Sequence, residues 1–318
     1  MHTIRRPTAG DVPAIFELVS THNIEIIGEP DITLADIRDE LAEPGLDLDK
    51  DVWLAWGPDG RLDGYAWAHH NGDSDLVDVQ VIVRPGVQDL EDELYRLVLD
   101  RAAESGAAAG HESVTVHAGL YGADQAKAVR LGRLGFEPGT SFHRMRIDHD
   151  GPVDPPEVPG GVTLHTGVSD EVRREAHRVH QVAFAEHFGF VAVPYEEWYE
   201  RRQVMSGTDW TQLTLAKVDG DPAGVVIGND EFVAGEQCGY VATLAVLPAY
   251  RGRGLGRFLL RHAFAADAAK GRKGTLLHVD SNNTTPALDL YESAGMRPVL
   301  VVEVWKRRLS GTSRKAPS

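Results

Sequence analysis

The stretch YVATLAVLPAYRGRGLG, Tyr240–Gly256, joins a strand, a glycine-rich loop and the start of a helix. Its first part, Tyr240–Val246, is typical of a buried strand, and Pro248 ends that strand. The helix that follows has an apolar face formed by Leu255, Phe258, Leu259 and Ala263. A loop in this setting presents backbone N–H groups and the positive end of the helix dipole to an anion. The stretch therefore predicts a binding site for a diphosphate.

Two widespread phosphate-binding loops do not match this stretch. A P-loop ends in glycine-lysine-serine or glycine-lysine-threonine, and a dinucleotide fingerprint needs three spaced glycines with a later acidic residue on a parallel strand. The pattern arginine-x-x-glycine-x-glycine, formed by Arg251, Gly254 and Gly256, resembles instead the acetyl-CoA loop of the GNAT acetyltransferases. Because glycines also serve tight turns, the loop needs support from a second motif.

That support comes from His278–Met296, HVDSNNTTPALDLYESAGM, which resembles the asparagine-then-LY-then-LGF motif that closes the GNAT site. The matching residues are Asn283, Ala287, Leu290, Tyr291 and Gly295, and Met296 replaces the usual phenylalanine. The two motifs occur in the expected order. The resemblance implies an α/β fold of GNAT type over residues 160–308, with a mixed, mostly antiparallel twisted sheet flanked by helices.

The resemblance also implies acetyl transfer from acetyl-CoA as cosubstrate to a primary amine. In the family the fourth strand diverges from the fifth, so that its backbone can bond the pantetheine and polarise the thioester carbonyl. The residues implied to bind the coenzyme are Leu244, Ala245, Val246, Arg251, Gly252, Arg253, Gly254, Leu255, Gly256, Arg257 and Asn283. No HExxH or similar ligand spacing occurs, so the sequence does not imply a metal.

Acetyl transfer requires an acid and a base. The attacking amine must be neutral, and the departing thiolate leaves more easily when it is protonated. Resemblance to the family places Tyr291 near the coenzyme sulfur, and a phenol is protonated at neutral pH, so we expect Tyr291 to be the acid. The base stays open among His278, Glu186, His187 and Glu236, with a chain of water molecules as a further option.

The segments PPEVPGGVTLHT, 155–166, and VHQVAFAEHFGF, 179–190, resemble the mycothiol synthase family, which also consists of tandem GNAT domains. Three positions depart from that family. Tyr240 stands where its glutamate base lies, Asn229 where a lysine contacts the substrate, and His278 where a tyrosine does. The architecture and the acetyl-CoA chemistry carry over, whereas mycothiol as the product does not follow.

Two glycine markers indicate that one fold occurs twice. Gly64 and Gly224 each follow the turn of a predicted hairpin, Gly135 and Gly295 each belong to an LGF-like corner, and both pairs are 160 positions apart. A proline- and glycine-rich connector lies between the halves. We therefore expect a degenerate N-terminal GNAT-like domain over 1–149, a linker over 150–161, a catalytic domain over 162–309 and a disordered tail over 310–318.

The N-terminal half lacks the glycine pattern. At the equivalent place it reads LVDVQVIVRPGVQDLEDELYRLVL, 76–99, where the strand and the proline remain. The acidic residues at the start of its helix are Asp89, Glu91, Asp92 and Glu93. They stabilise a helix N-terminus but repel a diphosphate. We expect this half to be catalytically silent.

Composition narrows the remaining possibilities. The net charge of −16 argues against nucleic acid as a partner, and Cys238 as the single cysteine excludes an internal disulfide. No signal peptide or membrane span is expected, which favours the cytoplasm, with either a monomer or a homodimer. The leading function is acetylation of a small-molecule amine. The alternatives are a protein N-acetyltransferase and a pseudoenzyme that senses acetyl-CoA.

Overall fold

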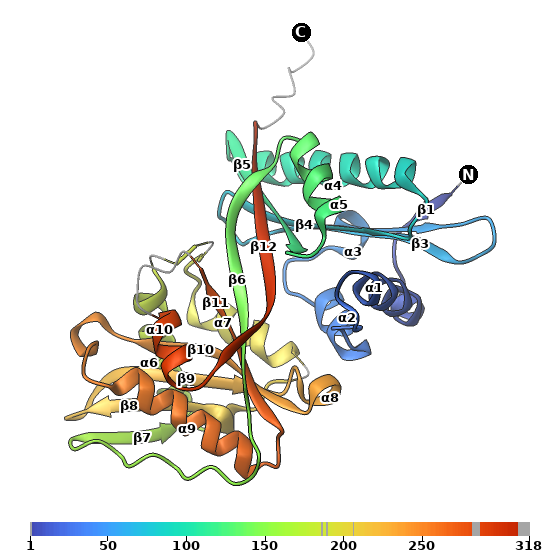
Figure 1. Cartoon of the computed structure of the whole chain (residues 1–318). Helices are drawn as coiled ribbons and strands as arrows, with labels where there is room; N and C mark the ends of the chain where they lie inside the picture. The colour runs from blue at the N-terminus through green and yellow to red at the C-terminus, as the bar shows by residue number, and fades with distance from the viewer. Residues whose placement is uncertain (1, 186, 189, 206, 282–286, 311–318) are drawn as a thin grey trace. The chain divides into compact units, whose positions relative to one another are not determined.

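The protein forms two compact units in a computed structural model that describes residues 2–185, 187–188, 190–205, 207–281 and 287–310 (Figure 1). Unit 1 comprises Met1–Thr140 with Val302–Ser318, and unit 2 comprises Ser141–Val301. Each unit has a mixed, mostly antiparallel sheet flanked by helices, as predicted from the sequence.

Unit 1 places its helices around a sheet with the order β1-β2-β3-β4-β5-β12, in which only β4 and β5 run parallel. Its strands are β1 (Thr3–Arg5), β2 (Val52–Trp56), β3 (Leu62–His70), β4 (Leu76–Val83), β5 (Ser113–Tyr121) and the second part of β12 (Arg297–Ser310). Its helices are the 3-10 turn η1 (Ala9–Asp11), α1 (Val12–Ile27), α2 (Leu34–Leu41), α3 (Leu48–Asp51), α4 (Gln88–Ala108) and α5 (Gln125–Arg133).

Both faces of this sheet are covered. Alternation along β2 sends Trp53 and Ala55 into the core under α4, and Val52 and Leu54 into the core under α1. Figure 1 shows α4 on one side of the strands and α1 with α2 on the other. The predicted hairpin of β2 and β3 is present, with its turn at Pro58–Gly60.

Unit 2 repeats this plan with the strand order β7-β8-β9-β10-β11-β6, in which only β10 and β11 run parallel. Its strands are β7 (Val162–Thr166), β8 (Leu213–Val218), β9 (Asp221–Asn229), β10 (Cys238–Val246), β11 (Gly274–Asp280) and the second part of β6 (Glu137–Asp148). Its helices are α6 (Asp170–Phe184), α7 (Tyr195–Val204), the 3-10 turn η2 (Trp210–Gln212), α8 (Val233–Glu236), the 3-10 turn η3 (Pro248–Tyr250), α9 (Leu255–Ala269) and α10 (Ala287–Ser293).

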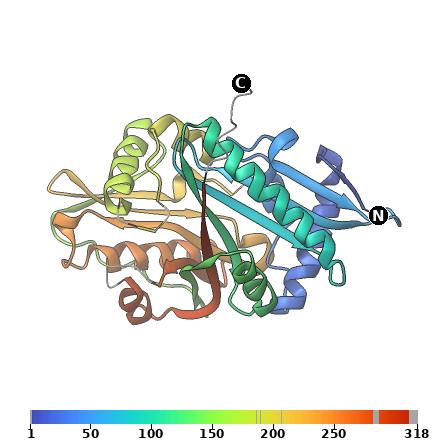
Figure 2. The same cartoon turned by 90° about the horizontal axis from the view of Figure 1, so that it is seen from above.

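The sheet of unit 2 is likewise buried on both faces. Ala216 and Val226 pack under α9, whereas Leu215 and Val225 pack under α6 and α7. In Figure 2 the orange helix α9 and the yellow-green helix α6 lie on opposite sides of these strands. The sheet thus holds α9, with its glycine-rich approach, in a fixed position against β10.

The chain exchanges the last strand of each half. Phe142–Asp148 of β6 pairs with β11, and Val302–Ser310 of β12 pairs with β5. Each compact unit therefore contains residues from both halves of the chain. The predicted domain bounds, 1–149 and 162–309, stay a prediction. A strand pattern does not reveal this exchange, because the same alternation suits either partner sheet. The predicted disordered tail begins at Ser310, which ends β12, and its other residues lie outside the described chain.

The repeated glycines perform the same two tasks in both units. A Cβ atom on Gly64 would lie 2.8 Å from Leu94 of α4, and one on Gly224 would lie 3.0 Å from Leu259 of α9. Each glycine thus lets a helix approach the sheet closely. Gly135 and Gly295 have φ angles of 81° and 97°, a region that favours glycine, and each follows a short helix. This agreement supports the predicted duplication.

We predict that Trp305→Ala destabilises unit 1, because Trp305 of β12 packs against its core. The free energy of unfolding should fall by about 2 kcal/mol, less than for a fully buried tryptophan because this one is half-buried. Urea unfolding measures this change, and hydrogen exchange should show lost protection along β5. Val299→Ala, at a 41% exposed position of the same strand, is the control and should change stability by less than about 0.5 kcal/mol. Unchanged protection of β5 would contradict the exchanged pairing.

Candidate functional site

Strands β10 and β11 pair only at their first residues. Cys238–Tyr240 pairs with Gly274–Leu276, and beyond these residues no further pairing links the two strands. A cavity of about 420 Å³ opens where they part, which is within the range of roughly 300–1,000 Å³ typical of small-ligand sites. We call it the β10–β11 cavity. The predicted divergence of the fourth and fifth strands is thus present.

Most of the predicted site residues line the β10–β11 cavity. They are Leu244, Ala245, Val246, Arg251, Gly252, Gly254, Leu255, Gly256, Arg257, His278 and Tyr291. Arg253 is not among the lining residues, and its guanidinium lies 5.7 Å from the centroid of the Tyr250 ring. The predicted residues Glu186 and Asn283 lie outside the described residues.

The glycine-rich loop forms an open approach to α9. Gly252 and Gly254 have φ angles of 74° and 79°, and Gly254 is the N-cap of α9. No described atom lies within 4 Å of the position that a Cβ atom on either glycine would take. The first N–H groups of a helix have no acceptor within the helix, so they are available to a ligand. This arrangement suits a diphosphate.

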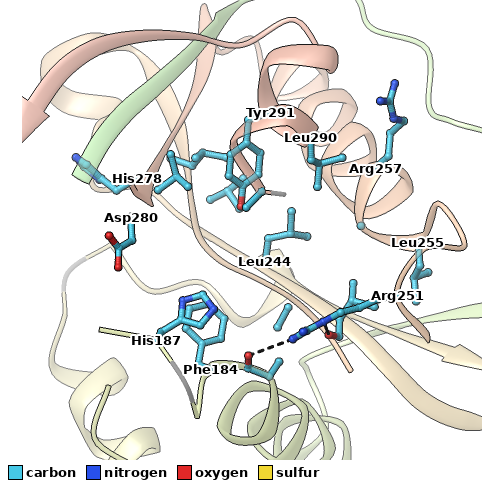
Figure 3. A pocket seen from close by; sticks show the side chains of 18 of the residues that line it. Phe184, His187, Leu244, Arg251, Leu255, Arg257, His278, Asp280, Leu290 and Tyr291 are labelled. Atoms are coloured by element: carbon cyan, nitrogen blue, oxygen red, sulfur yellow. Dashed lines mark hydrogen bonds between the residues drawn. The ribbon is translucent and has the colours of Figure 1, made fainter. Parts of the chain in front are cut away.

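Arg251 fixes the loop in place (Figure 3). Its Nε atom donates to the carbonyl oxygen of Val246 at 3.0 Å, and its Nη2 atom donates to that of Ala183 in α6 at 3.4 Å. These bonds tie the loop to the end of β10 and to the last turn of α6. In this structure Arg251 positions the approach to α9 through the backbone.

The backbone of β10 faces the cavity at alternate residues. The amide of Leu247 donates to Ala223 of β9 at 2.9 Å, and in an antiparallel ladder such bonds recur at every second residue. The backbone groups of Leu244 and Val246 therefore point away from β9, toward the gap that β11 leaves. The bond from Arg251 to the Val246 carbonyl lies on this side. Leu244 thus offers backbone groups of the kind that the family uses for pantetheine.

Tyr291 of α10 reaches the cavity from the opposite side. Its side chain is buried, and burial raises the pKa of the phenol to about 12. Figure 3 shows the hydroxyl directed into the cavity. At neutral pH the phenol is therefore protonated and able to donate. The same burial disfavours a thiolate in the cavity, which favours protonation of the departing sulfur.

His278 is engaged through both ring nitrogens. Arg144 of β6 donates from Nε to the Nε2 atom of His278 at 3.2 Å, and the Tyr240 hydroxyl lies 2.9 Å from its Nδ1 atom. A guanidinium only donates, so Nε2 accepts and the proton of the neutral ring resides on Nδ1. Tyr240 then accepts from Nδ1, and burial raises the pKa of this tyrosine above its ordinary value. For His278 to act as the base, the hydrogen bond from Arg144 to its Nε2 atom would have to break.

Two further base candidates differ in their placement. Glu236 does not line the cavity and is held by Arg146 at 2.7 Å and by Arg144 at 3.6 Å. His187 does line the cavity, with its ring 4.3 Å from that of Phe184. Burial lowers the pKa of His187, so its ring is neutral at pH 7.

The structure adds a residue that sequence analysis missed. Asp280, the last residue of β11, is buried and lines the β10–β11 cavity. An acidic residue at the carboxyl end of a largely buried strand was the available signal. Its importance depends on the departure of β11 from β10, which the strand pattern alone does not show.

The equivalent place in unit 1 carries different side chains. Leu131 stands 160 positions before Tyr291, and Lys127 stands 160 positions before Ala287, a lining residue of the cavity. Lys127 is buried and donates from Nζ to Gln80 of β4 at 2.8 Å. Unit 1 therefore has no phenol at the position that corresponds to Tyr291, and its catalytic silence stays a prediction.

Metal sites and membrane-spanning helices were sought over the whole described chain. Within residues 2–185, 187–188, 190–205, 207–281 and 287–310, no three His, Cys, Asp or Glu side chains gather as a possible metal site. Over the same residues we find no helix whose length and hydropathy would suit a bilayer span.

Comparison with known proteins agrees with the geometry. Residues 172–296 match the acetyltransferase (GNAT) family model. The chain is 26% identical over 202 residues to a mycothiol acetyltransferase of Renibacterium salmoninarum, covering 59% of this chain and 56% of the relative. It is 30% identical over 192 residues to that of Thermobispora bispora, covering 58% and 63%. The chain thus spans a little over half the length of these relatives.

Solved structures show the same fold over the full length. A GCN5-related N-acetyltransferase from Sphaerobacter thermophilus superposes with a TM-score of 0.82 at 24% identity, covering 97% of this chain and 96% of the other. A tandem GNAT protein from the clavulanic acid biosynthesis pathway gives a TM-score of 0.72 at 18% identity, covering 100% of both chains. Residues 172–296 thus match the acetyltransferase (GNAT) family, and the chain as a whole has the fold of a tandem GNAT protein and is similar to the mycothiol acetyltransferases.

Proposed function

We propose that the protein transfers an acetyl group from acetyl-CoA to the primary amine of a small molecule. The observation that carries this proposal is the meeting of three parts in one cavity. The N-terminus of α9, the unpaired side of β10 and the Tyr291 hydroxyl all border the β10–β11 cavity. The N-terminus of α9 suits the diphosphate of the coenzyme, and the unpaired side of β10 suits its thioester arm. The Tyr291 hydroxyl suits the departing sulfur.

The loop and β10 would hold the coenzyme. The free N–H groups at the start of α9 suit the diphosphate because each donates to an anion and the helix dipole adds to the attraction. The backbone of Leu244 suits the amide groups of pantetheine. The same backbone can donate to the thioester carbonyl, where negative charge grows as the amine attacks.

The chemistry follows from this placement. The neutral amine attacks the thioester carbonyl carbon, a C–N bond forms, and the intermediate then breaks its C–S bond. Tyr291 donates its phenolic proton to the sulfur, so that coenzyme A leaves as a thiol. An enzyme with these parts needs no covalent acetyl intermediate on the protein.

The acceptor differs in this proposal from what the relatives' names would suggest. Tyr240, which replaces the glutamate base of the mycothiol synthase family, is a half-buried phenol bonded to His278 and has a raised pKa. Such a group does not accept a proton from an amine at neutral pH. We therefore propose a small primary amine as the acceptor without extending the mycothiol precursor to this chain.

We predict that Gly254→Val abolishes coenzyme binding. A valine is strained at a φ of 79°, and its side chain would enter the open space beside the start of α9. Calorimetry should show one acetyl-CoA site per wild-type chain and an affinity loss of about 100-fold or more in the variant, which corresponds to about 2.8 kcal/mol.

Gly86→Val is the matched control for this prediction. Gly86 has a φ of 91°, no described atom lies within 4 Å of its Cβ position, and it occupies the corresponding loop of unit 1. This variant should carry a similar backbone strain and keep wild-type coenzyme affinity. Two sites per wild-type chain, or equal losses in both variants, would show that the loop of unit 2 is not the coenzyme site.

We predict that Tyr291→Phe lowers kcat by about 10²–10⁴ and leaves coenzyme affinity within a few-fold. The ring remains and keeps the packing, whereas the proton for the sulfur is lost. A thioester with a more acidic leaving thiol should recover part of the rate in the variant. Tyr199→Phe, on α7 and outside the cavity lining, is the control and should retain activity. Full activity of Tyr291→Phe would assign the acid elsewhere.

A further inference from the structure

The geometry points to His187 as the general base and to Asp280 as the residue that positions it. The inference rests on the proposed function and names the group that this function still lacks. His187 and Asp280 line the same cavity as the Tyr291 hydroxyl, yet they come from separate elements. His187 follows the end of α6, Asp280 ends β11, and Tyr291 belongs to α10.

Local structure holds the His187 ring in the cavity wall. Its amide donates to the Phe184 carbonyl at 2.8 Å, which turns the chain just beyond α6. Its ring lies against the Phe184 ring at 4.3 Å and 32°. Figure 3 shows His187 and Asp280 on the same side of the cavity, with Tyr291 across from them. An amine between the two sides could lose a proton on one and reach a thioester whose sulfur faces the other.

Two of the other base candidates, His278 and Glu236, are engaged by protein groups. His278 accepts from Arg144 through Nε2 and places its proton on Nδ1, so its lone pair is in use. Glu236 is paired with Arg144 and Arg146. By contrast, within the described chain neither ring nitrogen of His187 has a hydrogen-bond partner, and neither is sealed from solvent. Among these three side chains, only His187 offers a lone pair to the cavity.

Three charged or titratable groups act on His187. Asp280 from β11 raises its pKa, Arg251 from the loop before α9 lowers it, and His180 from α6 interacts with it when both are charged. Burial is the largest influence and leaves the pKa of His187 below its ordinary value of 6.5. The ring is therefore neutral at physiological pH. The carboxylate of Asp280 can stabilise the imidazolium that forms when the ring takes a proton.

The proton balance closes without another reagent. An ammonium group first releases one proton to solvent and becomes a neutral amine. As the C–N bond forms, His187 takes a second proton from the nitrogen, and as the C–S bond breaks, Tyr291 gives its proton to the sulfur. The imidazolium then returns a proton to the tyrosinate through water. The products are the amide and the thiol of coenzyme A, and the enzyme is restored.

The principal test is the pH profile of kcat/KM, measured as release of free thiol with the best acceptor from a panel of primary amines. The wild type should lose activity as the pH falls through the pKa of His187, below pH 6.5. His187→Gln should lower kcat by about 10²–10⁴ and abolish this acid limb, with coenzyme affinity retained. His262→Gln, a half-buried histidine on α9 outside the cavity lining, is the matched control and should match the wild type.

Asp280→Asn separates a positioning role from a merely structural one. Because the Asp280 charge raises the pKa of His187, its removal should lower that pKa. The acid limb should therefore move to lower pH while the plateau of kcat falls, since a less basic imidazole accepts a proton less readily. A structural defect alone would lower the rate without moving the limb.

Titration of the histidine ring signals by NMR tests the pair without any acceptor. The signal that disappears in His187→Gln should titrate below 6.5 in the wild type and at lower pH in Asp280→Asn. If His187 titrates independently of Asp280, or if His187→Gln keeps kcat and the acid limb, the inference is overturned. If the wild type binds acetyl-CoA but acetylates no amine while the titrations behave as expected, the proposed function fails instead.

Discussion

The site depends on the early end of the pairing between β10 and β11. Backbone N–H and C=O groups need partners, and a strand that loses its neighbour leaves one side of its ladder unsatisfied. Here β10 keeps β9 on one side, and after Tyr240 it no longer pairs with β11 on the other. A register shift between Val241 and Thr243 lies at this point, and irregularities of this kind bend a strand. The opening between the strands creates the cavity and provides the backbone groups that a ligand can satisfy.

In unit 1 the corresponding strands also stop pairing early. Strands β4 and β5 pair through Leu76–Val79 and then part in a similar way. Lys127 reaches Gln80 on β4 from α5, and burial lowers the pKa of its ammonium to about 8. A buried cation is retained only where polar groups compensate for lost hydration. In unit 1 a buried lysine therefore stands on the helix that corresponds to α10, whereas in unit 2 the corresponding helix lines the β10–β11 cavity.

Acid–base chemistry in unit 2 is decided by which polar groups the protein already satisfies. Arg144 donates to the Nε2 atom of His278 and so occupies its lone pair, and Tyr240 bonds to the Nδ1 atom. Tyr291 and His187 keep their polar atoms directed at the cavity from opposite sides. Burial acts on both in the useful direction, because it keeps a phenol protonated and an imidazole neutral.

The sequence by itself determined the fold class, the duplication, the glycine-rich loop and the position of Tyr291. These features are local, since turn glycines, strand alternation and a helix start leave marks within a few residues. Three features were decided by the tertiary structure alone. They are the exchange of β6 and β12, the hydrogen bond from Arg144 to His278, and the position of Asp280 in the cavity lining. Each of these joins residues far apart in the chain. Such contacts depend on which strands pair and where pairing ends, and residue types along one segment do not encode that.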